Sequence, residues 1–429
     1  MKDPLRIGIA GLGTVGVGLV RLLTENDDLI AARCGRRIEI AGVSARDRNK
    51  DRGIWPGRFD WFEDPRELAA SGRIDVFVEL IGGVGIAAEA VERALQSGKH
   101  VVTANKALIA ARGAGLAAEA EKWNLALNFE AAAAGGIPIV KALREGLAGN
   151  VVSRVGGILN GTCNYILSQM EETGRSFADV LAEAQALGYA EADPTLDVGG
   201  GDTAHKLAIL ASLAFGTVPD MDGVYCQGIE RISPVDIGFA REFGYRIKLL
   251  GIATMTARGL EARVHPAMIQ LGTALADVMG VLNGVVTESS AAGSSVFEGR
   301  GAGAGPTASA VAADLIDIAR GLRVPAFGVP SNLLRKAERA PLGEREGTFY
   351  MRFDVLDRPG VLATIASSLA DKGVSIESMI QRGRAPDEKV AIVIITHEAR
   401  ESSVIGAIKA VEAAGAVVEP PCMIRMERL

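Results

Sequence analysis

The stretch LRIGIAGLGTVGVGLVRLL, residues 5–23, decides the fold class of this chain. Its first six residues form an apolar run that is typical of a buried strand, and a helical pattern begins near Thr14. Between them the spacing G-x-G-x-x-G lets a pyrophosphate lie on backbone N–H groups at a helix N-terminus. The sequence therefore predicts a dinucleotide-binding unit, with a glycine turn that binds nothing as the alternative. The expected cofactor contacts here are Gly11, Leu12, Gly13, Thr14, Val15 and Gly16.

Strands and helices continue to alternate as far as residue 129. Strands are predicted over 38–43, 75–80, 100–103 and 125–129, and helices over 86–96 and 107–122. Strands that alternate with helices form a parallel sheet with helices on both faces. We therefore expect a Rossmann-type, doubly wound parallel sheet of the α/β class over residues 1–136.

A different pattern after this point indicates a second, α+β domain over residues 137–322. Strands are predicted at 151–159 and as a pair around 247–264, and helices at 163–172 and 177–187. Near its end, the glycine-rich turn at 299–305 precedes a helical run over 306–322. Such a turn before a helix is a natural contact for an anionic cofactor. We expect this helix to return to the first domain, with Gly303 beside the cofactor.

The last part of the chain predicts a linker and a third domain. Residues 323–346 contain three prolines and many charges without a clear period, which is typical of a linker. Residues 347–429 then follow the order βαββαβ, a ferredoxin-like split unit. Its strands are predicted at 349–355, 374–380, 389–396 and 416–424, and its helices at 359–372 and 401–414.

Composition excludes several classes of protein. The 429 residues include 46 basic and 52 acidic side chains, a net charge of -6, and no basic run interleaved with aromatics that would bind nucleic acid. No apolar run reaches the length of a membrane span, and the N-terminal residues lack the apolar core of a signal peptide. The four cysteines are widely separated, which favours reduced thiols. We expect a cytoplasmic protein with no nucleic-acid or membrane partner.

The segment after the second predicted strand bears on the choice of coenzyme. An acidic residue at the end of this strand would bind the ribose 2′-hydroxyl of NAD. The sequence instead has VSARDRNK, residues 43–50, in which Arg46 is the best placed cation. A guanidinium suits a 2′-phosphate, so NADP is favoured and NAD stays possible. Solvated surface cations are the alternative reading.

An acidic loop runs into a helix at GYAEADPTLDVGGGDTAHK, residues 188–206. Asp202 and Lys206 are four residues apart, so both project from one face of the helix. Glu191 and Asp197 lie in the loop, where the backbone can bend toward a common point. Such a cluster suits a small zwitterionic ligand, with an ordinary surface ion pair as the alternative. The glycines at 199–201 leave open how firmly the loop is held.

Taken together, these motifs closely resemble homoserine dehydrogenases of the monofunctional, three-domain type, over nearly the whole chain. The residues that carry the resemblance are GLGTVG (11–16), ELIGG (79–83), VVTANKALIA (101–110), EAAAAGGIPIVKAL (130–143), GGILNGTCNYIL (156–167), GYAEADPTLD (188–197), DTAHKLAIL (202–210) and GAGAGPTASAV (301–311). The resemblance implies the reversible reduction of L-aspartate 4-semialdehyde to L-homoserine by NADPH, on the route to threonine, isoleucine and methionine.

The resemblance also implies roles for single residues. Lys206 is the expected proton donor, and Lys106 is expected to orient the substrate oxygen and to contact the nicotinamide. Asp202 belongs to the same catalytic group. The substrate-binding residues implied are Glu191, Asp197, Asp202 and Gly188, with Gly188 also beside the cofactor. The polar turn at 160–164 is expected to support the second domain rather than the chemistry.

A monovalent cation, usually sodium, is a further implication of the resemblance. It would be held mainly by backbone carbonyls near the junction of the first two domains. The residues implied are Glu130, Ala133, Gly135 and Ile137. A glycine hinge between the domains is the alternative.

The stretch FDVLDRPGVLATIASSLADKGVSIESM, residues 353–379, resembles an ACT domain, a module that binds amino acids between paired copies. This implies feedback inhibition by threonine in a homodimer or homotetramer, with a module that only dimerises as the alternative. Two rival readings of the whole chain are a non-catalytic sensor of NADP and an amino acid, and another NADP-dependent reductase of a small amino acid or keto acid. The two lysines argue against the first. The acidic loop has no arginine for a second carboxylate, which argues against a keto acid.

Overall fold

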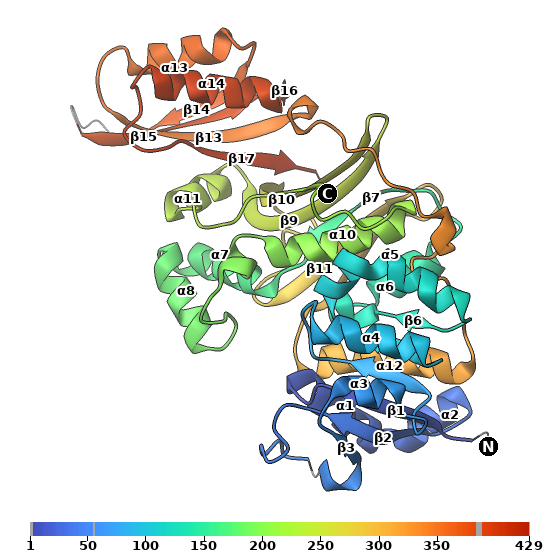
Figure 1. Cartoon of the computed structure of the whole chain (residues 1–429). Coiled ribbons are helices and arrows are strands. Elements are labelled where there is room, and N and C mark those ends of the chain that lie inside the picture. The colour runs from blue at the N-terminus through green and yellow to red at the C-terminus, as the bar shows by residue number, and fades with distance from the viewer. Residues whose placement is uncertain (1–2, 55, 383–387, 429) are drawn as a thin grey trace.

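Three groups of elements follow one another along the molecule in Figure 1, from the blue N-terminal elements to the red C-terminal ones. This computed structural model describes residues 3–54, 56–382 and 388–428. The outer ends of the first and last predicted domains, residues 1 and 429, lie outside the described residues. Within those ranges, no helix is both long and apolar enough to cross a membrane.

The N-terminal group is built on a six-stranded sheet in which every pairing is parallel, with the order β3-β2-β1-β4-β5-β6. Its strands are β1 (Leu5–Ala10), β2 (Ile38–Ser44), β3 (Asp60–Phe62), β4 (Val76–Glu79), β5 (His100–Thr103) and β6 (Leu127–Asn128). The chain order reverses between β1 and β4, and open parallel sheets bind ligands at the carboxyl ends of the strands beside such a point. The predicted Rossmann-type sheet is confirmed.

Helices cover both faces of this sheet. They are α1 (Thr14–Glu25), α2 (Asp27–Cys34), α3 (Pro65–Ala70), α4 (Ile86–Gln96) and α5 (Lys106–Lys122). The sequence prediction missed the short elements β3, α2 and α3. A helix start at α3 could have been found, because Pro65 is its first residue and the side chain of Asp64 accepts a hydrogen bond from the N–H of Arg66 at 2.8 Å.

Helix α12 (Ala304–Arg320) lies among these N-terminal helices although it is distant in sequence (Figure 1). Its buried Val311 and Leu315 belong to the same hydrophobic cluster as Ile7 and Leu19. At the start of α12 the approach to α1 is so close that a Cβ atom at Gly18 would lie 2.8 Å from the carbonyl oxygen of Ala304. The glycine-rich turn before α12 is thereby brought next to the fingerprint helix.

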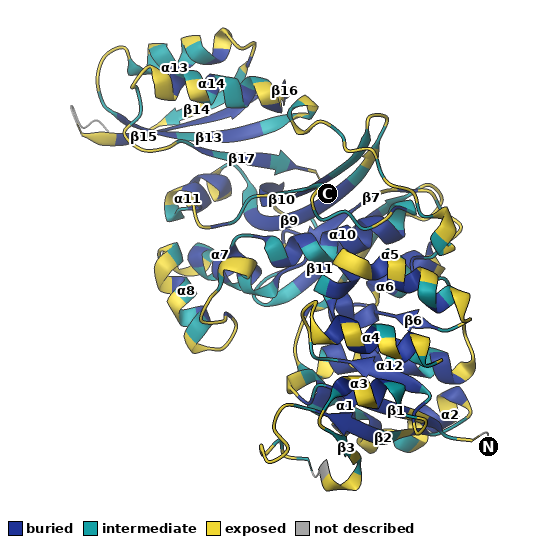
Figure 2. Ribbon diagram, in the orientation of Figure 1, coloured by how far each residue is buried: buried dark blue, intermediate teal, exposed yellow. Residues whose placement is uncertain are grey.

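The middle of the molecule is a second sheet covered on one face by helices. Its strands are β7 (Val152–Ile158), β8 (Val224–Cys226), β9 (Tyr245–Thr256), β10 (Gly259–Gln270), β11 (Leu282–Ser289) and β12 (Gly293–Arg300). Its helices are α6 (Ile139–Lys141), which continues into a π-helical turn (Ala142–Gly146), α7 (Gly161–Thr173), α8 (Phe177–Ala186), α9 (Thr195–Val198), α10 (Gly201–Phe215) and α11 (Pro234–Glu242). Helix α10 packs on β7 and β9 and is largely buried (Figure 2), so a polar residue on it is held in a fixed place.

The C-terminal group has the predicted order βαββαβ. Its elements are β13 (Glu346–Leu356), α13 (Val361–Ala370), β14 (Ile376–Gln381), β15 (Lys389–Thr396), a short β16 (Ala399–Arg400), α14 (Glu401–Ala413) and β17 (Cys422–Glu427). The prediction of a last strand at 416–424 was wrong, because the strand begins only after Pro420 and Pro421, which have no N–H to donate to a sheet.

Strand β17 joins the middle sheet and the strands of the C-terminal group into one sheet. It pairs in parallel with β10 and antiparallel with β13, which gives an 11-stranded sheet. Nine of its strands follow the order β12-β11-β7-β9-β10-β17-β13-β15-β14, and off this path β8 pairs with β10 and β16 with β13. The segment 323–346 is also bound along its length rather than free. The N–H of Val218 donates to the carbonyl of Arg335 at 2.9 Å, and the N–H of Leu260 donates to that of Glu338 at 2.8 Å.

Candidate active site

The glycine fingerprint forms a close turn between β1 and α1. A Cβ atom at Gly11 would lie 2.4 Å from the carbonyl oxygen of Leu80, and one at Gly16 would lie 2.0 Å from that of Gly11. Gly13 differs, because a Cβ atom there would have no atom within 4 Å. Gly13 is also the N-cap of α1, and no side chain caps this helix. The space and the free helix N-terminus together fit a pyrophosphate on the N–H groups of Thr14 and its neighbours.

These contacts predict that one substitution in the fingerprint weakens coenzyme binding and another lowers stability. Gly13→Ala leaves the fold intact but fills the space for the pyrophosphate, so we expect the Kd for the coenzyme to rise about tenfold or more, roughly 1.4 kcal/mol. Gly16→Ala drives a methyl group into the backbone, so we expect a clear fall in Tm. Thermal unfolding and a coenzyme titration by fluorescence measure the two effects. Unchanged coenzyme binding in Gly13→Ala would contradict this assignment.

The predicted coenzyme-selecting loop follows β2. Arg46 is exposed there, just after the buried Ser44 at the end of the strand. The side chain of Arg52 fastens the loop to the fingerprint, because its Nε donates to the carbonyl of Leu12 at 3.1 Å and its Nη2 to that of Asp47 at 2.6 Å. Arg46 is thus held on the same edge of the sheet as the glycine turn.

A buried polar network positions Lys106 at the carboxyl ends of β4 and β5. The carboxylate of Glu79 is fully buried and accepts hydrogen bonds from the N–H groups of Ile81 and Gly82, both at 2.8 Å, and from the hydroxyl of Thr103. Asn105 then caps α5 through the N–H of Leu108 at 3.0 Å. Lys106 is the first residue of α5, so its backbone is fixed beside the topological switch point.

The carboxylate of Asp202 brings the two predicted lysines together. Its Oδ1 lies 2.8 Å from Nζ of Lys106, and its Oδ2 lies 2.8 Å from Nζ of Lys206. Nζ of Lys206 also donates to the carbonyl of Leu159 at 2.7 Å. The side chain of Asp202 is 6% exposed and that of Lys206 is 11% exposed, whereas that of Lys106 is 36% exposed. An ion triad of this kind links the first domain to the second.

The charges of this triad fix its protonation state. Burial alone would raise the pKa of Asp202, but Lys206 and Lys106 outweigh burial and lower that pKa far below its usual range. Burial alone would lower the pKa of Lys106, but Asp202, Asp197 and Glu191 raise it. Asp202 is therefore ionised and Lys106 is charged at neutral pH.

Asn160 is part of the site, which the sequence analysis did not foresee. Its side-chain nitrogen donates to Asp197 Oδ1 and to Asp202 Oδ2, both at 2.8 Å, while its oxygen caps α7 through the N–H of Cys163 at 2.8 Å. Burial raises the pKa of Asp197, and the charge of Asp202 adds to this effect against the hydrogen bond from Asn160. The turn before α7 thus holds two of the predicted acids. The only hint in the sequence is that asparagine favours helix N-caps.

The remaining loop residues are less enclosed. The side chain of Glu191 is exposed, and Gly188 ends the turn after α8 with a positive φ of 75°. Asp193 accepts hydrogen bonds from the N–H and hydroxyl of Thr195 at 3.1 and 2.6 Å, which closes a turn. The glycines at 199–201 do not loosen the loop, because a Cβ atom at Gly200 would lie 2.9 Å from both Cys226 Sγ and a methyl of Val264. They allow the loop to pack closely instead.

The residues implied for a cation lie in a tight turn between the first two domains. The carboxylate of Glu130 is buried and accepts the N–H groups of Val140 and Lys141 at 3.0 and 2.8 Å. Burial and the charge of Asp314 raise the pKa of Glu130 to about 7. Among the described residues, no three side chains of the metal-binding kinds are grouped to hold an ion. The cation site implied by the resemblance stays a prediction.

Cys163 lies beside the site in a buried position. Sγ of Cys163 is buried and lies 3.2 Å from the carbonyl oxygen of Asp197, and burial raises the pKa of its thiol. All four cysteines are free. The two predicted lysines instead share the carboxylate of Asp202.

A dinucleotide-type parallel sheet with Lys106 at its carboxyl edge, paired through Asp202 with Lys206 of the second domain, is typical of an NAD(P)-dependent oxidoreductase. The family models agree: "Homoserine dehydrogenase, NAD binding domain" matches residues 11–130, "Homoserine dehydrogenase" matches 138–316, and "ACT domain" matches 349–413. The homoserine dehydrogenase of Neisseria gonorrhoeae is 48% identical over 99% of both chains, and that of Pseudomonas aeruginosa is 46% identical over 99% of both. A crystal structure of a homoserine dehydrogenase from Thiobacillus denitrificans has a TM-score of 0.93 at 43% identity, covering 99% of this chain and 98% of that one. The chain belongs to the homoserine dehydrogenase family.

Proposed function

We propose that this enzyme reduces L-aspartate 4-semialdehyde to L-homoserine with NADPH, at the ion triad of Lys106, Asp202 and Lys206. The observation that carries the proposal is that one buried carboxylate holds both ammonium groups within 2.8 Å, one on each oxygen. The first domain, over residues 1–136, would bind the coenzyme, and the second, over 137–322, the substrate. Both lysines lie where these domains meet.

The two lysines have different tasks in this proposal. A bound nicotinamide would supply a hydride to the aldehyde carbon, and negative charge would then develop on the aldehyde oxygen. Lys106 is more exposed and firmly charged, so it orients this oxygen and stabilises the developing charge. Lys206 is more enclosed and directed by Asp202 and the carbonyl of Leu159, so it donates the proton.

The acidic residues of the site have two different roles. Both oxygens of Asp202 are already engaged by the lysines and by Asn160, so it organises the site. Glu191 and Asp197 have carboxylate oxygens left for the substrate ammonium group. Direct substrate binding by Asp202 stays a prediction of the sequence analysis.

The reaction itself is tested by the rate of NADPH oxidation with a panel of carbonyl substrates. We expect turnover with L-aspartate 4-semialdehyde and none with pyruvate or 2-oxobutyrate, which have no amine for the acidic loop. Turnover with the keto acids but not with the amino-acid aldehyde would contradict the proposal.

A preference for NADP is supported by Arg46 and by Ser44, rather than an acid, at the end of β2. We expect Arg46→Ala to raise the KM for NADPH about tenfold, because an ion pair with the 2′-phosphate is lost, and to leave the KM for NADH unchanged. Arg48→Ala is the matched control, since that guanidinium lies over the ring of Trp61 at 5.8 Å. Equal effects on both coenzymes would refute the role of Arg46.

Three further features complete the proposal. Sodium would bind at the carbonyls of Glu130, Ala133, Gly135 and Ile137, a position supported by the positive φ of 52° at Gly135 that turns successive carbonyls. Threonine would act as feedback inhibitor at the ACT domain, in a homodimer or homotetramer. These points, and a cytoplasmic location, rest on the resemblance and on the sequence.

A further inference from the structure

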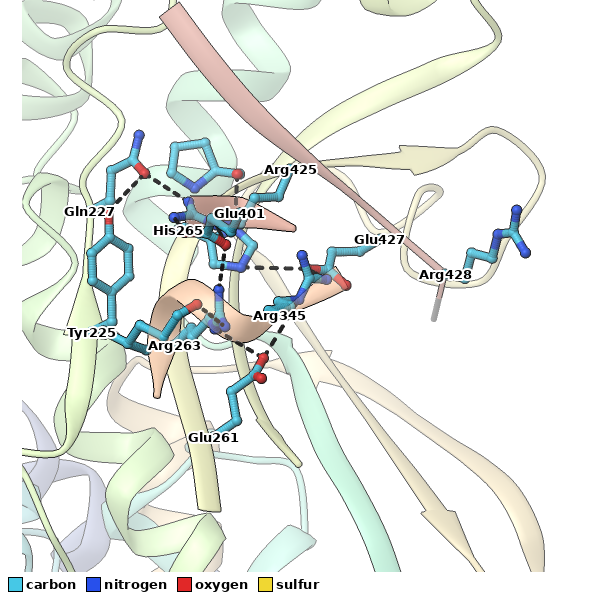
Figure 3. A network of polar contacts seen from close by, with 12 residues as sticks. Tyr225, Gln227, Glu261, Arg263, His265, Arg345, Glu401, Arg425, Glu427 and Arg428 are labelled. Carbon is cyan, nitrogen blue, oxygen red and sulfur yellow. Dashed lines mark hydrogen bonds and ion pairs between the residues drawn. The ribbon is translucent and has the colours of Figure 1, made fainter. Parts of the chain in front are cut away.

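A buried ionic cluster fastens the C-terminal strand to the catalytic domain (Figure 3). Arg425 on β17 is 1% exposed, and its Nε and Nη2 donate to the two oxygens of Glu401 at 3.0 and 2.5 Å. Glu401 begins α14 of the ACT domain and also accepts from Nη1 of Arg263 on β10 at 2.7 Å. One carboxylate thus joins the ACT domain, the C-terminal strand and the catalytic sheet.

The third nitrogen of Arg425 reaches a loop of the catalytic domain. Its Nη1 donates to the side-chain oxygen of Gln227 at 2.9 Å, and its guanidinium lies 5.0 Å from the centre of the Tyr225 ring. The N–H of Gln227 donates to the carbonyl of Val264 on β10 at 2.8 Å. The loop after β8 is therefore held on one side by the sheet and on the other by Arg425.

The same loop supports the segment that carries Asp197. The N–H of Ile229 donates to the carbonyl of Val198 at 3.0 Å, and Sγ of Cys226 donates to that of Gly199 at 3.2 Å. Val198 directly follows Asp197 in α9, and Gly199 directly follows Val198. A shift of this loop would move the backbone of Val198 and Gly199, and with it Asp197.

We propose that Arg425 and Gln227 are positioning residues for substrate binding, which act through the loop at 226–229 on Asp197. The inference rests on the proposed function, because it takes Asp197 as a ligand of the substrate ammonium group. It adds a path by which the ACT domain and the substrate loop are mechanically joined within one chain. A change in the position of Glu401 would alter the hydrogen bond from Arg425 to Gln227. The position of Asp197 would change as a result.

Kinetics and calorimetry of the full-length enzyme test this path. The variants are Gln227→Met, Arg425→Lys and the double variant, with Arg428→Ala as a matched control, since that side chain on the same end of the chain points away from the cluster (Figure 3). We expect each single variant to raise the KM and the Kd for L-homoserine about five- to tenfold, with kcat within about twofold and the KM for NADP unchanged. The double variant should show no more than the larger single effect, because both changes break one path.

Distinct outcomes separate this proposal from the proposed function. Gln227→Met leaves the pair of Arg425 and Glu401 intact, so it decides the question even if Arg425→Lys does not fold. An unchanged Kd for L-homoserine in a folded Gln227→Met enzyme, or additive effects in the double variant, would overturn the positioning path. Weakened homoserine binding in an enzyme whose wild type does not oxidise homoserine would instead refute the proposed reaction and leave the path standing.

Discussion

Lys206→Ala is expected to lower kcat for aldehyde reduction by about a thousandfold, within the range typical for removal of a general acid. The lysine donates to Asp202 and to the carbonyl of Leu159, which leaves its third hydrogen for the substrate oxygen. Coenzyme binding should be unaffected, because the fingerprint lies on a different domain. Stopped-flow absorbance of NADPH with the semialdehyde measures the chemical step, and a coenzyme titration measures binding.

Lys106→Ala is the natural comparison for this prediction. We expect it to raise the KM for the aldehyde and to weaken charge stabilisation, since it removes an ammonium group that is 36% exposed at the edge of the site. Lys206→Arg keeps the charge but donates a proton poorly, so it should stay slow. A near-wild-type rate in Lys206→Ala would refute its role, and a much larger loss in Lys106→Ala would exchange the two roles.

Asp202→Asn is expected to have the second largest effect, on both stability and catalysis. The substitution leaves two ammonium groups beside a neutral amide in a site where the side chain is 6% exposed. Removing one partner of a buried charge cluster typically costs about 3–5 kcal/mol, which urea unfolding would show. The pKa of Lys106 should fall, because the carboxylate that raises it is gone. The alkaline limb of the pH–rate profile should therefore move to lower pH.

The pH dependence of stability gives a second readout of Asp202. Its pKa is lowered in the folded state, so its contribution is fully present above the unfolded pKa of about 4 and is lost as the pH falls through the folded value. Asp202→Asn should therefore reduce the loss of stability in acid. Asp193→Asn is the control in the preceding loop, because, among the described residues, that exposed carboxylate bonds only to Thr195 and closes a turn. In the pH–rate profile, an alkaline limb that does not move in Asp202→Asn would contradict the proposed effect of Asp202 on the pKa of Lys106.

Local patterns in the sequence predicted the elements of the fold well where the pattern is regular. The strand and helix around the fingerprint begin at Leu5 and Thr14 as expected. Short elements such as β3 escaped, because three residues give no period to detect. The last strand was misplaced, and its pairing with β10 depends on a contact between residues more than 150 positions apart. No local pattern encodes such a pairing.

The sequence predicted the charged residues of the site but not the polar residues that position them. The spacing of Asp202 and Lys206 places both on one helix face, and the structure brings them together. The arrival of Lys106 at the same carboxylate depends on how two domains meet, which no spacing shows. Asn160 escaped for a related reason, because its partners lie 37 and 42 residues away. Gly200 allows close packing that an isolated glycine run would not suggest.

The central claim is that the aldehyde oxygen lies at the lysine pair while the amine lies at the acidic loop. A crystal structure of the enzyme with NADP and L-homoserine tests it most directly, through the distance from the C4 hydroxyl oxygen to Nζ of Lys206. We predict a hydrogen bond of about 2.7–3.2 Å, with the ammonium group facing Asp197 and Glu191. A hydroxyl beyond hydrogen-bond distance of both lysines, with the coenzyme in place on the fingerprint, would contradict the claim.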